Sequence, residues 1–261
     1  MKYSGRTQML SNRHTIFESL DLFKSYGFDG VEICFEDIAF RLRPDLIDDR
    51  IIALVRNHCE SIGLVISAVS NHMRYFFDDF IYEQMIKEIK SAKKYGTDIF
   101  VISVMNDANE RVACKELRKT ALERIRGFCK VAEAEGVRLA LEPEPPSIFS
   151  NTNDFITLCR EIDSPALCMN FDVGHAFLTD EDMLASIDLV KDKIIHGHVE
   201  DMQRGQHLHL FPGDGDMDLA AVISKLHQVG FDGYLSLDLY NYIYEDVAKA
   251  ALDTLRNIEK L

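Results

Sequence analysis

Metal-capable side chains follow two short apolar runs in the second half of the sequence. Asp172 and His175 come after the first run, and His196 and His198 come after the second. A polar segment with helical character, Asp180–Asp192, separates the two runs. The order apolar run, polar end, helix, apolar run, polar end indicates a parallel βαβ unit with chemistry at its strand ends. Each side chain alone is equally compatible with a capping or surface role, so matching residues at other strand ends must decide.

Short runs rich in valine, isoleucine, leucine and phenylalanine recur along the whole chain, with amphipathic helical patterns between them. Several helical patterns stop at a glycine, such as Gly27, Gly63 and Gly96, as helices commonly do. No linker-like or low-complexity segment divides the chain, so we expect one domain over residues 1–261. The expected strands are 2–7, Gly30–Phe35, Leu64–Val69, Ile99–Val104, Val137–Leu141, Leu167–Phe171, Lys193–Ile195 and Tyr234–Leu239.

Eight strands, each followed by a helix, in 261 residues are what a (β/α)8 barrel requires. An open doubly wound sheet is the competing α/β arrangement, and it usually carries a glycine-rich phosphate turn after its first strand. The first expected strand has no such turn, and the glycines of Pro212–Gly215 follow a loop instead. We therefore predict an α/β fold, a single (β/α)8 TIM barrel, in which Gln203–Asp216 forms an irregular loop.

The C-terminal ends of all strands in such a barrel meet on one face. The last four expected strands deliver Glu142, Asp172, His198 and Asp238 to that face. Neighbouring strands lie about 4.8 Å apart, so these four side chains can surround one cation. Without a cation the three carboxylates would repel one another. Hard oxygens with one nitrogen suit Mn²⁺, Mg²⁺ or Co²⁺, or else Zn²⁺, so we predict one divalent metal ion here and expect His196 to point away from it.

Composition limits the partners and the cellular setting. The formal net charge of −14 disfavours nucleic acid and anionic membranes as partners. No apolar stretch approaches the roughly 20 residues that span a bilayer. The N-terminal segment lacks the apolar core of a signal peptide, so we expect a cytoplasmic protein. Six cysteines without a CxxC pair are expected to be reduced and not to bind metal.

Six short motifs spread along the chain carry a family resemblance: Gly30-Val-Glu-Ile, Leu141-Glu142-Pro, Asn170-Phe-Asp172-Val-Gly-His175, His196-Gly-His198-Val-Glu-Asp201, Pro212-Gly-Asp-Gly215 and Ser236-Leu-Asp238-Leu-Tyr240. Together they resemble the xylose-isomerase-like barrel superfamily. It includes ketose 3-epimerases, sugar-phosphate isomerases, inosose and 3-dehydroshikimate dehydratases, and AP-endonuclease-type repair enzymes. Dimers and tetramers are common in this family, so the resemblance allows a homo-oligomer.

The resemblance implies roles for individual residues. Glu142 and Asp238 would serve as acid/base catalysts in addition to binding the ion. His175 and Arg204 match positions at which ketose epimerases contact substrate hydroxyls, and we add His72 as a further substrate contact. The family usually has glutamate at the eighth-strand position, whereas Asp238 is shorter by one methylene group, which draws its carboxylate back.

We predict a metal-dependent isomerase or epimerase that acts on a sugar, a sugar phosphate or a related polyol. Glu142 would remove the proton next to the carbonyl, the ion would stabilise the enediolate, and Asp238 would return a proton to the other face. A metal-dependent dehydratase or lyase of a cyclic polyol or keto acid would use the same ligands. A barrel that binds sugar without turning it over is a further alternative, because Asp238 departs from the usual acid.

A phosphodiesterase of the DNA-repair type is the alternative from another class. It would need more histidines, for which His72, His207 and His209 are available. The acidic composition opposes DNA binding, and the last two fall in the expected irregular loop.

Several acidic residues near the predicted ligands have a structural or supporting role in our interpretation. Glu200 and Asp201 are expected to hydrogen-bond the histidine ligand, as carboxylates often do in metal sites. Glu144, between prolines, is expected to face solvent. Glu32 and Glu36 either line the pocket or form salt bridges.

Overall fold

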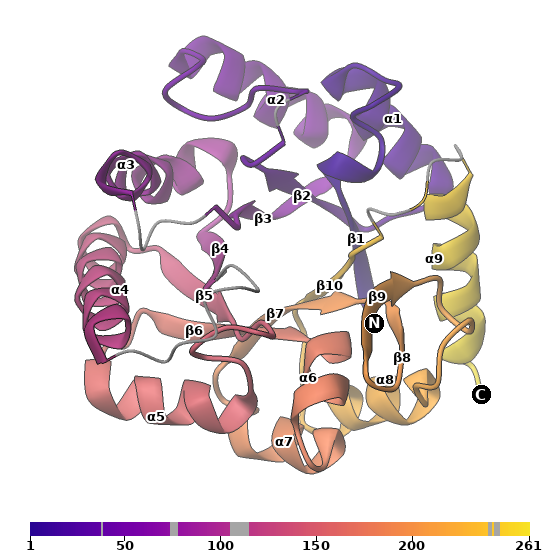
Figure 1. Ribbon diagram of the computed structural model, residues 1–261. Coiled ribbons are helices and arrows are strands. Elements are labelled where there is room, and N and C mark those ends of the chain that lie inside the picture. The colour runs from indigo at the N-terminus through magenta and orange to yellow at the C-terminus, as the bar shows by residue number, and fades with distance from the viewer. Residues whose placement is uncertain (38, 74–77, 105–114, 240–241, 243–245) are drawn as a thin grey trace.

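Parallel strands close into a barrel, and helices surround it (Figure 1). The computed structural model describes residues 1–261 except 38, 74–77, 105–114, 240–241 and 243–245. Around the barrel the strand order is β1-β10-β7-β6-β5-β4-β3-β2, which confirms the predicted (β/α)8 barrel. The barrel strands are β1 (Lys2–Arg6), β2 (Gly30–Cys34), β3 (Val65–Asn71), β4 (Ile99–Ser103), β5 (Arg138–Glu142), β6 (Leu167–Asp172), β7 (Ile194–Val199) and β10 (Tyr234–Leu237).

Side chains along each barrel strand alternate between the barrel interior and the surrounding helices. On β4, Phe100 and Ile102 belong to the main hydrophobic core. Val101 instead belongs to a small separate cluster with Ala68 and Ala140. The apolar interior positions come early in the strands, so the later interior positions are left to polar side chains that face one another.

Helices begin and end where the sequence supplies caps. Thr15 and Glu18 form a capping box at the start of α1, and Gly27 ends it with a φ of 93°. The helices are α1 (Ile16–Tyr26), α2 (Asp49–Ile62), α3 (Asp79–Tyr95), α4 (Lys115–Glu135), α5 (Thr152–Ile162), α6 (Val173–Thr179), α7 (Met183–Val190), α8 (Leu219–Gln228) and α9 (Val247–Ile258), and a 3-10 turn covers Thr7–Met9.

Two helices follow β6, where the sequence analysis expected one over Asp180–Asp192. Asp172 accepts a hydrogen bond from the backbone N–H of His175 at 2.7 Å, so α6 begins directly at the strand end. Asp182 caps α7 by accepting from the N–H of Ala185 at 3.0 Å. The expected helix is therefore shorter than predicted, and the additional helix α6 carries His175 next to the end of β6.

A two-stranded hairpin replaces most of the irregular loop expected after β7. It consists of β8 (Asp201–Gln203) and β9 (Gln206–Leu210), which pair antiparallel. Arg204 and Gly205 form the two-residue turn, and Gly205 has a positive φ of 76°, which glycine adopts without a steric penalty. The expectation of a wholly irregular segment is wrong because this turn allows the chain to fold back at once.

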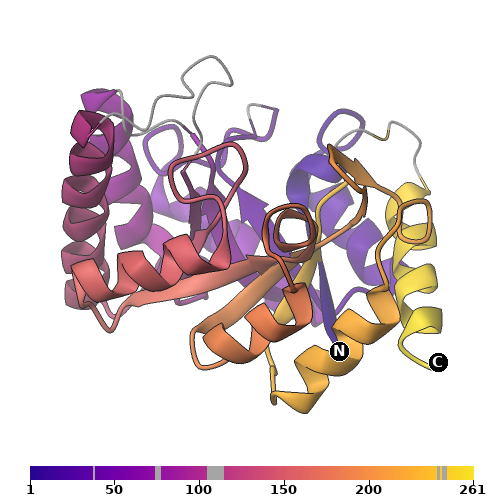
Figure 2. The ribbon, with the colours of Figure 1, turned by 60° about the horizontal axis from the view of Figure 1, so that its bottom comes forward.

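The barrel strands are parallel, so their C-terminal ends share one end of the barrel, and both chain termini lie at the other (Figure 2). The ammonium group of Met1 contacts the carboxylate of Glu259 near the C-terminus. Within the described residues, no helix combines the length and the apolar character needed to cross a membrane.

A buried glutamate supports the end of β3. Glu88 on α3 accepts a hydrogen bond from Asn71 Nδ2 at 2.6 Å and lies 3.3 Å from Arg43 Nε. Burial raises the pKa of Glu88 from 4.5 to about 7. The folded protein therefore holds this proton more tightly than the unfolded chain does. The stability that follows from the tighter binding is present at low pH and is lost as the pH rises through the folded pKa.

Replacing Glu88 with glutamine is expected to remove this pH dependence, because glutamine keeps a hydrogen-bond acceptor for Asn71 but does not ionise. From about pH 5 to about pH 8, the unfolding free energy of the unmodified protein should fall by about 2 kcal/mol more than that of Glu88→Gln. Urea unfolding at both pH values measures the difference, with the exposed Glu60→Gln as control. An equal fall in Glu88→Gln and the unmodified protein would contradict the assignment.

Candidate metal centre and active site

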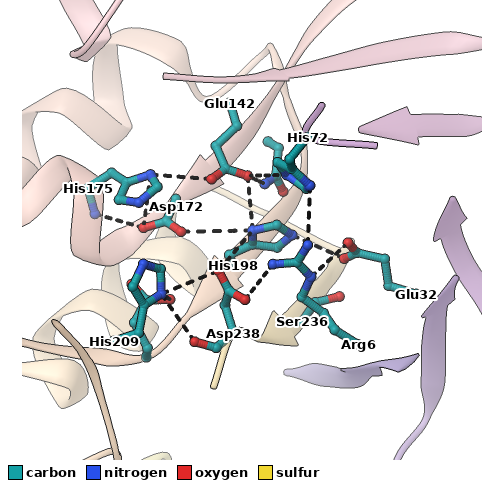
Figure 3. A network of polar contacts seen from close by, with 12 residues as sticks. Arg6, Glu32, His72, Glu142, Asp172, His175, His198, His209, Ser236 and Asp238 are labelled. Atoms are coloured by element: carbon teal, nitrogen blue, oxygen red, sulfur yellow. Dashed lines mark hydrogen bonds and ion pairs between the residues drawn. The ribbon is translucent and has the colours of Figure 1, made fainter. Parts of the chain in front are cut away.

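The four side chains predicted to bind a metal lie together at the end of the barrel (Figure 3). The register of β6 and β7 places Asp172 beside His198. His198 Nδ1 lies 2.9 Å from Glu142 Oε2, 3.8 Å from Asp172 Oδ2 and 4.0 Å from Asp238 Oδ2. All four residues are at most 3% exposed.

Two of these atoms are buried without a hydrogen bond. Asp172 Oδ2 and His198 Nδ1 form no hydrogen bond of acceptable geometry among the described residues, although Glu142 Oε2 lies 2.9 Å from His198 Nδ1. Leaving a buried polar atom unsatisfied costs about 1–3 kcal/mol, so both atoms favour an additional ligand between them. Three carboxylates and one imidazole are a donor set that suits a divalent cation. The residues present therefore fit a divalent ion held by Glu142, Asp172, His198 and Asp238.

Burial has different outcomes for the charges of Glu142 and of the neighbouring His196. Burial alone would raise the pKa of Glu142, but His198 and His175 hold it well below its ordinary value. Burial lowers the pKa of His196 to about 4, so this ring is neutral near pH 7. Its Nδ1 lies 2.8 Å from Asn170 Oδ1 and its Nε2 lies 3.2 Å from a serine hydroxyl on β10. His196 therefore hydrogen-bonds these neutral groups deeper in the barrel, and its Nε2 lies 3.7 Å from Glu32 Oε2.

The acid that contacts the histidine ligand comes from β2. Glu32 Oε2 lies 3.1 Å from His198 Nε2. The carboxylate of Glu200 lies against that of Asp172, and Asp201 accepts the N–H of Gly213 at 2.9 Å. The expectation that Glu200 and Asp201 hydrogen-bond His198 is therefore wrong, because the chain turns into the hairpin after β7 and carries Asp201 to the following loop.

Glu32→Gln is expected to weaken metal binding about 10–100-fold, because the carboxylate that orients His198 and raises its basicity is lost. Titration calorimetry with Mn²⁺ measures the change, and the exposed Glu60→Gln should bind as the unmodified protein does. Unchanged Mn²⁺ affinity in Glu32→Gln would show that this contact does not support the metal ligand.

A cavity of about 290 Å³ opens beside the four residues. The predicted substrate contact His72 lines it, with Nε2 3.3 Å from Glu142 Oε2 and Nδ1 2.9 Å from Glu36 Oε1. His175 lines it from α6, with Nδ1 3.3 Å from Glu142 Oε1. Both histidines thus stand between the candidate ligands and the open space, where a small polar molecule would lie.

The fold and the site can be compared with known proteins. The family model described as xylose isomerase-like TIM barrel matches residues 20–258. The chain belongs to this family. Solved structures of similar fold include a 3-keto-D-glucoside 4-epimerase from E. coli in its apo form, with a TM-score of 0.79 at 19% identity over 100% of both chains. A D-tagatose 3-epimerase-like protein has a TM-score of 0.80 at 19% identity, over 100% of this chain and 97% of the other.

Curated relatives of this xylose isomerase-like barrel include a dehydratase and an epimerase. The 3-dehydroshikimate dehydratase of Pseudomonas putida is 26% identical over 92% of this chain and 38% of its own length. The fructoselysine 3-epimerase of Shigella flexneri is 29% identical over 51% of each protein. The chain thus spans about half of the epimerase and less than half of the dehydratase.

One site residue of this xylose isomerase-like barrel escaped the sequence analysis. Arg6, at the end of β1, contacts the carboxylate of Asp238 and lies 3.1 Å from Glu32 and 3.0 Å from Glu36. Gly5 pairs with Leu237, so Arg6 and Asp238 leave neighbouring strands side by side. The available signal was a charged residue at the end of the first strand, next to the eighth strand in a closed barrel.

Two further side chains, Arg204 and Glu144, do not lie where the sequence analysis expected them. Arg204, predicted to contact substrate, is exposed in the hairpin turn, with its guanidinium 4.5 Å from the ring centre of Phe177 on α6. It does not line the cavity. Glu144 was expected to face solvent, but it lines the cavity, so that expectation is wrong. It follows Glu142 by two residues and therefore emerges on the same side of the chain.

Proposed function

We propose that this protein is a divalent-metal-dependent isomerase or epimerase, which moves a proton next to the carbonyl of a sugar or sugar phosphate. One observation carries the proposal: Glu142 and Asp238 line the same cavity and lie on opposite sides of His198 (Figure 3). Two acid/base groups on opposite sides of one carbon are what inversion at that carbon requires. The epimerases among the relatives agree with this chemistry.

Each carboxylate acts as the base in one direction of the reaction. Neighbouring histidines hold Glu142 in its anionic form, as the base of the forward direction requires. Against the effect of burial, the guanidinium of Arg6 holds the pKa of Asp238 well below its ordinary value, which suits Asp238 as the base of the reverse direction and opposes its protonation as the acid of the forward one. Glu142 takes the proton from one face of the carbon, and Asp238 delivers a proton to the other. His72 and His175 orient the hydroxyls of the substrate.

A divalent cation bound by the four candidate ligands supplies Lewis-acid stabilisation of the negative charge that develops beside the carbonyl. Its identity is proposed as Mn²⁺, with Mg²⁺, Co²⁺ and Zn²⁺ compatible with the same donors. Arg204 would contact substrate only if the hairpin turn moved toward the cavity.

Hydrogen exchange with solvent tests the proposed reaction. In deuterated buffer containing Mn²⁺, a panel of ketoses that includes D-tagatose and D-allulose should yield a sugar that gains deuterium on a carbon next to its carbonyl. NMR and mass spectrometry locate the label. Absence of label from every sugar and sugar phosphate in the panel, with the ion bound, would contradict the proposed function.

A dehydratase is the second candidate, because the alignment with the P. putida enzyme covers 92% of this chain. The same carboxylates would remove a proton next to a carbonyl and assist the loss of a neighbouring hydroxyl group. Incubation with 3-dehydroshikimate separates the two candidates, since loss of water from it gives an aromatic product with strong ultraviolet absorption. Formation of that product without ketose exchange would favour the dehydratase.

A further inference from the structure

A row of hydrogen bonds runs through the barrel interior beneath the candidate ligands and ends on Glu142. Asn170 Nδ2 lies 2.6 Å from Glu142 Oε2, and Asn170 Oδ1 lies 2.8 Å from His196 Nδ1. His196 Nε2 lies 3.2 Å from the hydroxyl of Ser236, which lies 2.6 Å from the hydroxyl of Ser4. We call Asn170, His196, Ser236 and Ser4 the interior polar row, and all four are fully buried.

The register of the strands explains why these residues meet. β6, β7, β10 and β1 are neighbours in the barrel, and each contributes one residue to the row. Asn170 pairs with His196 across β6 and β7, and the two serines pair across β10 and β1. Asn170 and His196 each come two positions before a candidate ligand, so the row lies on the same face of the strands, one layer deeper in the barrel.

The hydrogen-bond donors in the row all point toward the carboxylate. An ionised carboxylate only accepts, so the amide nitrogen of Asn170 faces Glu142 and the amide oxygen faces His196. The amide oxygen also only accepts, so His196 carries its proton on Nδ1 and accepts from Ser236 at Nε2. Ser236 can then accept from Ser4. Hydrogen bonds that run in one direction strengthen one another, so the row acts as one support for Glu142.

Glu142 needs such a support because the proposed reaction gives its two oxygens different tasks. Its Oε2 lies 2.9 Å from His198 Nδ1, among the candidate ligands, whereas its Oε1 lies 3.3 Å from His175 beside the cavity (Figure 3). The last torsion of a glutamate side chain is broad, so an unsupported carboxylate can turn and leave both positions. The hydrogen bond from Asn170 reaches Oε2 and thereby distinguishes the two oxygens.

We propose that Asn170 is a positioning residue for Glu142. It keeps Oε2 toward the candidate ligands and leaves Oε1 to take the proton of the substrate, while His196 holds the amide in the orientation that this requires. Asn170 does not line the cavity, so it acts through Glu142 and not on the substrate. Because it concerns the proposed base, the inference rests on the proposed function.

Asn170→Leu tests the proposal, because leucine has nearly the same size and no hydrogen-bond donor. At saturating Mn²⁺, kcat for deuterium exchange into a ketose that the protein converts should fall about 10–100-fold, with little change in KM. The affinity for Mn²⁺, measured by titration calorimetry without sugar, should fall about tenfold. An unchanged kcat at full Mn²⁺ occupancy would overturn the proposal.

Thr152→Val is the matched control. The buried hydroxyl of Thr152 donates to Asp180 Oδ2 at 2.6 Å, so this change also removes a donor to a carboxylate, but away from the cavity. Both variants should unfold at lower urea concentrations than the unmodified protein, whereas only Asn170→Leu should lose kcat. Equal losses of kcat in the two variants would show a merely structural role for Asn170.

Two substitutions of His196 test whether this residue holds Asn170. The side-chain nitrogen of asparagine can take the place of Nδ1, so His196→Asn keeps a donor to the amide oxygen of Asn170. His196→Leu has nearly the same size as His196→Asn and no donor. The kcat of His196→Asn should therefore be about tenfold higher than that of His196→Leu. Equal kcat values would show that His196 does not orient Asn170.

Failure of the proposed function gives a different result from failure of the positioning. If the unmodified protein exchanged no ketose, and Asn170→Leu still bound Mn²⁺ more weakly than Thr152→Val, the proposed reaction would be wrong and the support of Glu142 by Asn170 would stand. Without exchange, equal Mn²⁺ affinities in the two variants would reject both.

Discussion

Replacement of Glu142 by glutamine is expected to lower solvent exchange and turnover about 10²–10⁴-fold, because the amide cannot accept the substrate proton. The same change removes one negative charge from the candidate metal centre, so the affinity for Mn²⁺ should fall as well. Exchange of deuterium into the ketose and calorimetric titration with Mn²⁺ measure the two effects separately. Measurement at saturating Mn²⁺ isolates the loss of the base from the loss of the ion.

The neighbouring cavity residue provides a comparison for this variant. Glu144 lines the same cavity but is not among the four candidate ligands, so Glu144→Gln should have a much smaller effect on exchange and should keep its Mn²⁺ affinity. If Glu142→Gln retained both its metal content and its turnover, the assignment of Glu142 as ligand and base would be wrong.

Arg6→Met is expected to destabilise the folded protein by about 3–5 kcal/mol in the absence of metal, the usual consequence of removing one partner from a buried ion pair. Arg6 is 4% exposed and contacts Asp238, Glu32 and Glu36. Without its charge these carboxylates repel one another in a buried site. Urea unfolding measures the loss, and added Mn²⁺ should recover part of it, because the ion binds only the folded state.

An arginine in an exposed ion pair, Arg138, provides the matched control for the buried Arg6. Arg138 pairs with Asp98 at 2.8 Å, and the two side chains are 44% and 46% exposed. Arg138→Met should cost at most about 1 kcal/mol, as exposed ion pairs do. Similar losses in Arg6→Met and Arg138→Met would show that Arg6 does not compensate the buried acids.

Arg6 also bears on the shortened acid of the eighth strand. One oxygen of Asp238 contacts Arg6, and the other lies 4.0 Å from His198 Nδ1 and 3.3 Å from His209 Nδ1. The guanidinium thus fixes the orientation of the aspartate, and the second oxygen faces the other candidate ligands. This arrangement gives Asp238 a defined position although its side chain is shorter than glutamate.

The residues at the strand ends could be predicted from the sequence because the apolar run directly before each of them identifies the strand. Each apolar run identifies a strand, and alternation along it determines which residue at its end points into the barrel. Asp172 and His198 were placed together on these grounds, and the register of β6 and β7 pairs them. Closing the strands into a barrel then brings Glu142 and Asp238 to the same end.

Contacts between strands that are far apart in the sequence were not predictable in this way. Glu32 contacts His198 from β2, and Arg6 contacts Asp238 from β1, although both pairs are far apart in sequence. Only the closed barrel makes them neighbours, and no periodicity in the chain encodes which acid faces which base. The search for a partner of His198 in the adjacent residues therefore chose the wrong acids.

The hairpin was missed for a different reason. The residues after β7 are mostly polar, and strands as short as Asp201–Gln203 carry little pattern. The informative signal was the Arg204-Gly205 turn between two short alternating segments. Missing it left His209, which lines the cavity, outside the predicted site.

Anomalous scattering from a crystal of the protein grown with Mn²⁺ tests the central claim most directly. The account predicts one peak among the side chains of Glu142, Asp172, His198 and Asp238, bonded to oxygen or nitrogen atoms of these residues. A peak only between His175, His207 and His209, or no peak at Mn²⁺ concentrations that support turnover, would contradict it.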